Sequence, residues 1–230
     1  MNRLPLRAVC FDMFYTLADP HASLERLESE ALGLTPEQWG RAMWDPQQSR
    51  DRGLGLIDSP MAIIEGACGL LPGLRFTRAQ KEAAAAAKVE RMRLALTEIR
   101  PEFLDTLRAL KARGLLLGLI SNADVADRLH WEDSPLYPLF DDAIFSCDVG
   151  LLKPDPAIYR LSLEHLGVRP EEAAFVGDGA GGELQGAGAL GMTTVCTECL
   201  TRYHGKQRAE LHASADHVIT VFASLKRLLH

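Results

Sequence analysis

The feature that most constrains the fold is an alternation of helical and strand patterns that begins near residue 101. Segment 101–114 starts with proline, ends with glycine and places Phe103, Leu107 and Leu110 at helical spacing. The apolar segment 115–121 follows directly and has the length of a strand. Because the same order recurs to the end of the chain, the sequence predicts a doubly wound parallel sheet of the α/β class, covered by helices on both faces.

The expected elements can be placed by residue number. The strands are predicted at 7–12, 115–121, 143–149, 173–178, 193–198 and 217–220. The helices of this part are predicted at 101–114, 123–131, 156–166, 183–190 and in a closing segment that reaches 229.

The stretch between the first and second strands lacks any comparable strand pattern and is predicted to be helical. Thr35-Pro36-Glu37 and Thr77 are typical N-terminal signals of helices. We therefore expect a core domain formed by residues 1–17 and 97–230, with residues 18–96 inserted as a helical cap domain. The cap helices are predicted at 24–32, 36–44, 61–70 and 79–96.

Composition excludes several classes of protein. The 31 acidic residues outnumber the 25 lysines and arginines, for a net charge of −6, which disfavours nucleic acid as a partner. No apolar run approaches the length of a membrane span, and the short N-terminal run reaches Asp12 too soon for a signal peptide. The five cysteines are expected to be reduced, as in a cytoplasmic protein.

Polar side chains follow four of the predicted strands. In open α/β sheets, ligands bind beyond the carboxyl ends of the strands, so these side chains should meet in one crevice. Each group alone is ordinary turn or cap chemistry, and only their joint appearance in this order is informative. The groups are Asp12 to Thr16, Ser121-Asn122, Lys153-Pro154-Asp155, and Asp178 with Glu183.

These segments resemble the four motifs of the haloacid dehalogenase (HAD) superfamily of hydrolases. The segments are AVCFDMFYTLAD, LGLISNAD, GLLKPDPAIY and FVGDGAGGELQGAGALGM. The resemblance implies a Rossmann-like core and, from the position of the insertion, a helical cap between the first and second motifs.

The resemblance also implies roles for the residues. Asp12 would be the nucleophile that forms a covalent aspartyl intermediate, and Thr16 would orient its carboxylate. Ser121 and Asn122 would bind the transferring group, while Lys153 would shield the nucleophile from an anionic substrate.

The resemblance also implies a Mg²⁺ cofactor for this chain, as in the phosphatases of the family. The expected ligands are the carboxylates of Asp12, Asp178 and Glu183 and the main-chain carbonyl of Phe14. Carboxylate oxygens are the ligands that Mg²⁺ prefers.

The residue two positions after the nucleophile departs from the phosphatase pattern. Phosphatases of the family usually have a second Asp there as general acid and base, whereas this chain has Phe14. The phenol of the next residue, Tyr15, is a poor replacement at neutral pH. Because general acid–base catalysis typically contributes about 10²–10⁴-fold, a phosphatase of this kind should be slow or restricted to good leaving groups.

Three functions are compatible with these residues. The favoured one is a Mg²⁺-dependent hydrolase of small phosphorylated metabolites. The alternative is a 2-haloacid dehalogenase, in which halide leaves without a proton and an aromatic residue at position 14 is normal. The third is a relative that binds a phosphorylated ligand or a protein without turnover.

The expected substrate is a small anionic molecule chosen by the cap. Arg50 and Arg52 are the predicted substrate-binding residues of the insertion, since guanidinium groups bind carboxylate and phosphate well, although a plain surface role is the alternative. His204 is a minor candidate for a general base near the crevice.

Overall fold

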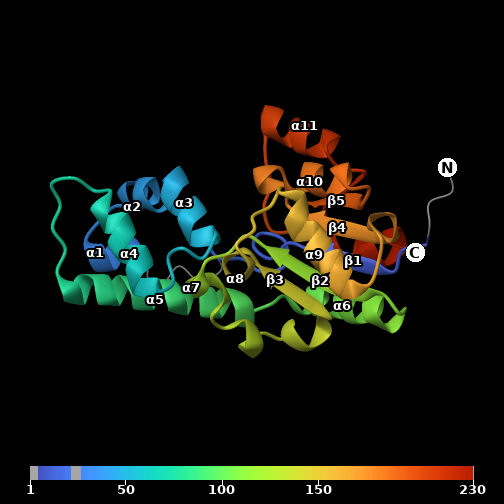
Figure 1. Ribbon diagram of the computed structural model, residues 1–230, viewed down its shortest axis with the longest axis horizontal. Coiled ribbons are helices and arrows are strands. Elements are labelled where there is room, and N and C mark those ends of the chain that lie inside the picture. The colour runs from blue at the N-terminus through green and yellow to red at the C-terminus, as the bar shows by residue number, and fades with distance from the viewer. Residues whose placement is uncertain (1–4, 22–26, 230) are drawn as a thin grey trace.

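A parallel six-stranded sheet forms the centre of the computed structural model, which describes residues 5–21 and 27–229 (Figure 1). The strands are β1 (Ala8–Phe11), β2 (Leu116–Ser121), β3 (Asp142–Phe145), β4 (Ala173–Gly177), β5 (Thr193–Thr197) and β6 (His217–Ile219). They lie in the order β3-β2-β1-β4-β5-β6, and every neighbouring pair is parallel. The predicted α/β fold is therefore confirmed, and its strand order reverses between β1 and β4, where such sheets form a ligand crevice.

Helices cover both faces of the sheet. The α-helices in this part are α6 (Pro101–Ala112), α7 (Val125–Arg128), α8 (Ser146–Val149), α9 (Pro156–Leu166), α10 (Glu183–Ala189), α11 (Gly205–Ala213) and α12 (Leu225–Leu228). Short 3-10 helices are η1 (Trp131–Asp133), η2 (Tyr137–Leu139), η3 (Pro170–Glu172), η4 (Ala180–Gly182) and η5 (Phe222–Ser224).

Side chains of β1 alternate between two apolar layers, as the period of a strand requires. Val9 and Phe11 pack in the layer that includes residues of α6 and α12, whereas Ala8 and Cys10 pack in the layer with α9 and α10. Both faces of β1 are buried, so all of its side chains are apolar. The first polar side chain is that of Asp12, directly after the strand.

The helices between β1 and α6 lie to one side of the sheet (Figure 1). They are α1 (Glu28–Leu32), α2 (Pro36–Met43), α3 (Pro46–Gly53), α4 (Pro60–Gly69) and α5 (Arg78–Thr97). All of them except α3 contribute to an apolar cluster of their own, which Ala126 of α7 joins. Thr35 and Thr77, which were predicted as N-terminal signals, cap α2 and α5, and each forms a capping box. Residues 24–26 of the first predicted cap helix lie outside the described residues, and the domain boundaries at 17/18 and 96/97 stay predictions.

Three segments differ from the sequence prediction. Residues 146–149 were expected to extend β3 but form α8, where the Ser146 hydroxyl bonds both backbone groups of Ala123. Residues 46–53 were expected to connect helices but form α3, which begins at Pro46 with Asp45 as its cap. The polar helix α11 was not predicted, because it lacks an apolar stripe.

None of the helices in the described part of the chain combines the length and the hydropathy needed to cross a membrane.

Candidate active site

Asp12 lies directly beyond the end of β1, at the point where the strand order reverses. Its backbone N–H donates to the Val176 carbonyl (2.9 Å), which extends the pairing of β1 with β4 by one residue. The chain then turns tightly, with Tyr15 in the left-handed region (φ 61°). This turn brings the Thr16 hydroxyl back to donate to Asp12 Oδ2 at 3.1 Å. The predicted partnership of these two side chains is therefore present, and the Asp12 side chain keeps 11% of its surface exposed.

Lys153 reaches the same point from the loop after α8. Its ammonium lies 2.6 Å from Asp12 Oδ1 and 2.6 Å from Glu183 Oε2. Burial alone would lower the pKa of Lys153, but the carboxylates of Asp12 and Glu183 raise it well above its ordinary value. The ammonium therefore stays charged beside Asp12 at any pH at which an enzyme works.

Ser121 is the last residue of β2 and Asn122 follows it, as predicted, and the two differ in their bonding. The Asn122 side chain donates to the Lys153 carbonyl (3.0 Å) and accepts from the Lys153 N–H (2.8 Å), so it fixes the loop that carries the lysine. The Ser121 hydroxyl is buried and has no hydrogen-bond partner among the described residues. A buried hydroxyl without a partner is available to a ligand. The predicted roles of both residues in substrate binding stay predictions.

Two more carboxylates complete the cluster. One oxygen each from Asp12, Asp178 and Glu183 lies within 4.8 Å of the others, and all three residues are buried. Asp178 accepts from the Ala180 N–H (3.0 Å) and from the Tyr203 hydroxyl (2.7 Å), and Glu183 accepts from the Gly179 N–H (3.0 Å). The structure therefore brings together the three carboxylates that the sequence analysis grouped, and their role as metal ligands stays a prediction.

The cluster has more negative than positive charge. Three carboxylates face one ammonium, so the pKa of Glu183 is raised by burial and by the nearby Asp12 and Asp178, against the opposing effect of Lys153. Burial and the charge of Asp12 also raise the pKa of Asp178. Three buried carboxylate oxygens so close together form a suitable set for Mg²⁺, which accepts carboxylate ligands and relieves their repulsion.

Gly177 is necessary for this arrangement. A Cβ atom at this position would overlap the carboxylate of Glu183, so any side chain here would displace that group. The glycine at the end of β4 therefore leaves the space that the Glu183 carboxylate occupies.

Phe14 is half-buried and packs against the apolar layer that contains Phe11. A phenyl ring has no proton to exchange, so the side chain two residues beyond Asp12 cannot act as an acid or base. The hydroxyl of the next residue, Tyr15, bonds the ring of His21 (2.9 Å), and burial is the main reason that its pKa is raised. A ligand role for the Phe14 carbonyl stays a prediction.

The two predicted arginines of the insertion lie on α3 and have different surroundings. Arg50 is exposed, whereas Arg52 is buried and bonds Asp124 (3.0 Å) and the Met43 carbonyl (2.7 Å). Substrate binding by either residue stays a prediction, and in this structure the Arg52 guanidinium is committed to partners within the protein.

Tyr203 is a site residue that the sequence analysis missed. It lies in an irregular segment after β5, with no motif around it, and only the fold brings it to Asp178. The neighbouring His204, which the sequence suggested as a base, is exposed at the start of α11. Tyr159 of α9 was also missed; its buried hydroxyl donates to the Glu183 carbonyl (2.9 Å) and so supports the first turn of α10.

Known proteins of this kind include dehalogenases and phosphatases. An (S)-2-haloacid dehalogenase 4A of Burkholderia cepacia is 30% identical over 207 residues, which cover 83% of this chain and 82% of that protein. A glyceraldehyde 3-phosphate phosphatase of Methanocaldococcus jannaschii is 36% identical over 107 residues, which cover 45% of this chain and less than half (46%) of the phosphatase.

The solved structures that share the fold include proteins of the same two kinds. A crystal structure of a dehalogenase superposes with a TM-score of 0.69 at 25% identity and covers 97% of both chains. Further dehalogenases and two phosphatases share the fold at lower identity. A family model for hydrolases, described as haloacid dehalogenase-like hydrolase, matches residues 6–191. With this match across most of its length, the chain belongs to the haloacid dehalogenase-like hydrolases.

Proposed function

We propose that this hydrolase removes halide from a small 2-haloacid through a covalent ester on Asp12. The observation that carries the proposal is Phe14, which leaves the position two residues beyond Asp12 without a proton donor. Halide is a stable anion and leaves without protonation, so this chemistry does not need the missing group. The dehalogenase relative also covers far more of the chain than the phosphatase relative does, and it therefore supports this activity over the phosphatase that the sequence alone favoured.

The first step is displacement at the carbon that carries the halogen. A carboxylate oxygen of Asp12 forms a bond to this carbon while the carbon–halogen bond breaks and its electron pair leaves with the halide. Thr16 and Lys153 hold the two Asp12 oxygens and so fix the direction of attack. The free hydroxyl of Ser121 is the proposed donor to the carboxylate of the substrate.

The second step is hydrolysis of the ester. Water adds to the Asp12 carbonyl carbon and gives one proton to a nearby carboxylate. As the ester bond breaks, the departing alkoxide takes the second proton of that water and leaves as a 2-hydroxyacid, and the proton on the carboxylate is then released to solvent. Asp178 is the proposed acceptor, because its carboxylate lies in the cluster with Asp12 and has a raised pKa. The Asp12 carboxylate is restored at the end of the cycle.

A Mg²⁺-dependent phosphatase is the second candidate, and a specific observation favours it. The carboxylate cluster around Lys153 is short of positive charge, and Gly177 leaves the space that Glu183 needs. Asp12, Asp178 and Glu183 would hold the ion, which when bound would neutralise a phosphoryl group beside the nucleophile. Without an acid at position 14, such an enzyme should favour substrates with good leaving groups, such as acyl phosphates.

One substrate screen separates these functions. The purified chain is assayed with 2-chloropropionate, an aryl phosphate and an acyl phosphate, each with Mg²⁺ and with EDTA. Release of chloride that is undiminished in EDTA supports the dehalogenase. Phosphate release that EDTA abolishes, without chloride release, overturns that proposal in favour of the phosphatase. The absence of both products would leave a binding protein.

The position of Phe14 gives a second test. Phe14→Asp restores the group that phosphatases of the family usually have, so it should raise turnover of ordinary phosphate monoesters while chloride release does not rise. Phe14→Asn is the matched control, because it has a similar size and no titratable proton. An equal gain in both variants would show that the carboxyl is not the missing component.

A further inference from the structure

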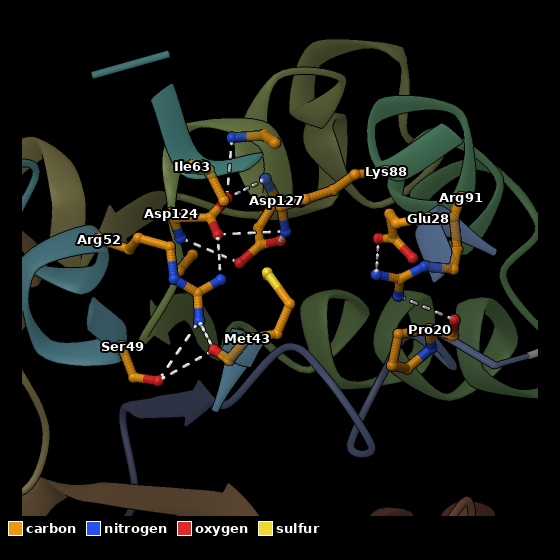
Figure 2. A network of polar contacts seen from close by, with 12 residues as sticks. Pro20, Glu28, Met43, Ser49, Arg52, Ile63, Lys88, Arg91, Asp124 and Asp127 are labelled. Carbon is orange, nitrogen blue, oxygen red and sulfur yellow. Dashed lines mark hydrogen bonds and ion pairs between the residues drawn. The ribbon is translucent and has the colours of Figure 1, made fainter. Parts of the chain in front are cut away.

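A second cluster of buried charges lies between the helical insertion and the sheet domain (Figure 2). Two basic residues of the insertion, Arg52 of α3 and Lys88 of α5, converge on Asp124 and Asp127 at the start of α7. The side chains of Arg52, Lys88 and Asp124 keep 7%, 3% and 2% of their surface exposed. These contacts therefore cannot be treated as surface ion pairs, which contribute little.

The two carboxylates each use one oxygen for α7 and one for the insertion. Asp124 Oδ1 accepts from the Ala126 and Asp127 N–H groups, and Asp127 Oδ2 accepts from the Asp124 N–H, which together form a capping box. Asp124 Oδ2 bonds Arg52 (3.0 Å) and Lys88 (3.1 Å), while Asp127 Oδ1 bonds Lys88 (2.7 Å). The start of α7 is thus fixed by its own backbone and by the insertion at once.

The same segment carries groups of the candidate active site. Asp124 lies two residues after Asn122, which bonds both backbone groups of Lys153, and three residues after Ser121. Between them, the Ala123 N–H donates to the Ser146 hydroxyl (3.0 Å). A displacement of Asp124 would therefore pass through a segment of only three residues, two of which bond the segments that follow β3, to the groups around Asp12.

Helix α3 makes a second contact with the loop that leads to Lys153. A Cβ atom at Gly53 would lie 2.7 Å from Leu152, and one at Gly55 would overlap the Cys147 carbonyl. The end of α3 therefore lies close against the sheet domain: Gly55 has a positive φ (73°) and faces a backbone oxygen, so it requires glycine, whereas a side chain at Gly53 would have to displace Leu152. The arginine contact and this close packing place α3 against the segments that follow both β2 and β3.

We infer that Asp124 is a positioning residue. Together with Arg52 and Lys88, it makes the alignment of three site residues depend on contact with the insertion. These residues are Ser121, Asn122 and Lys153. The kinetic part of this inference rests on the proposed hydrolase function. Asp124, Arg52 and Lys88 do not touch the reacting atoms; they act by holding the segment that does. Small displacements of aligned groups reduce rates by as much as about 10²-fold, so the effect should be seen mainly in kcat.

The test uses a graded series at the two charged partners. Arg52→Met and Asp124→Asn remove the ion pair, and the asparagine keeps an oxygen for the capping box. Both should lower kcat by about 10- to 100-fold with a smaller change in KM, and Arg52→Lys should recover part of the loss because it keeps the charge. Arg78→Met, which removes an exposed ion pair with Glu82 from α5, is the matched control and should change kcat by less than about twofold.

Hydrogen exchange of residues 121–128 provides a readout that does not need a substrate. These amides should exchange faster in Arg52→Met than in the wild type or Arg78→Met. A lowered melting temperature with unchanged kcat and unchanged exchange in this segment would overturn the inference. If the wild-type chain turns over neither haloacids nor phosphates, the proposed function fails, and the exchange comparison alone decides on the coupling. If Arg52→Met does not fold, Asp124→Asn and Arg52→Lys carry the same comparison.

Discussion

The two buried charge clusters of this chain differ in their balance. The junction cluster pairs two basic residues, Arg52 and Lys88, with two carboxylates, whereas the site cluster places three carboxylates around Lys153 alone. Every carboxylate oxygen in both clusters has a hydrogen-bond partner within the protein, so the clusters differ in charge and not in the number of bonded oxygens.

Each cluster includes or adjoins one buried polar atom without a partner among the described residues, Arg52 Nε in the junction cluster and the Ser121 hydroxyl at the site. The pKa values of Asp178 and Glu183 are both raised, whereas in the junction cluster burial raises the pKa of Asp124 and the pKa of Asp127 is lowered, because Lys88 and the Asp124 N–H together outweigh its burial. The difference indicates that the junction cluster serves structure, while the site cluster is arranged for a ligand.

The largest effect should come from the nucleophile of the site cluster. Asp12→Asn removes the attacking oxygen but keeps the shape of the side chain, so turnover should fall by at least about 10⁴-fold on any substrate. Circular dichroism should show an unchanged fold. Activity that survives in the purified variant would exclude Asp12 as the nucleophile.

The next largest effect is a loss of stability, which should differ between the lysines of the two clusters. Lys153→Met leaves three buried carboxylates without a cation and should lower the free energy of unfolding by about 3–5 kcal/mol. Lys88→Met should destabilise less, because Arg52 still faces Asp124. Lys81→Met is the control, because Lys81 lies on α5 like Lys88 but pairs with Glu65 at a more exposed position. Denaturant unfolding measures all three, and equal losses at Lys153 and Lys88 would contradict the proposed difference in balance.

A smaller effect is expected at Tyr203. Tyr203→Phe removes one hydrogen bond to the Asp178 carboxylate but keeps the ring, so it should lower kcat by about tenfold, the equivalent of about 1.5 kcal/mol for a hydrogen bond to a charged group. Tyr15→Phe removes a hydroxyl that bonds His21 and serves as the control. Equal kinetics in both variants would mean that Tyr203 does not position Asp178.

The last prediction concerns the pH dependence of stability in the absence of metal. The raised pKa of Glu183, about 8 in the folded chain against an ordinary 4.5, means that the folded state holds this proton more tightly than the unfolded state does. The free energy of unfolding should therefore decrease as pH rises from about 4.5 to about 8. Glu183→Gln should flatten this slope in the same EDTA-containing buffer. A wild-type stability that rises across this window would show that Lys153 outweighs the two neighbouring carboxylates.

Much of the site could be predicted because its main residues follow strands directly. Ser121 is the last residue of a buried parallel strand, and Asp12 and Asp178 each come directly after one, so finding the strands also located these side chains. Lys153 and Glu183 were also singled out by their place after strands, and the resemblance of their motifs supplied their expected roles. Arg52 was assigned toward the substrate on charge alone, although the structure shows its guanidinium bonded to Asp124, which no local pattern indicates.

The sequence by itself determined the α/β class, the site edge of the sheet and the cluster of carboxylates around one lysine. These features follow from the apolar periods of strands and helices and from the rule that parallel strands end at one edge. Only the tertiary structure decided which charges pair with which, that Tyr203 reaches Asp178 and that the insertion holds Asp124. Such contacts join residues far apart in the chain, and their energy depends on distance and burial, which no short stretch of sequence specifies.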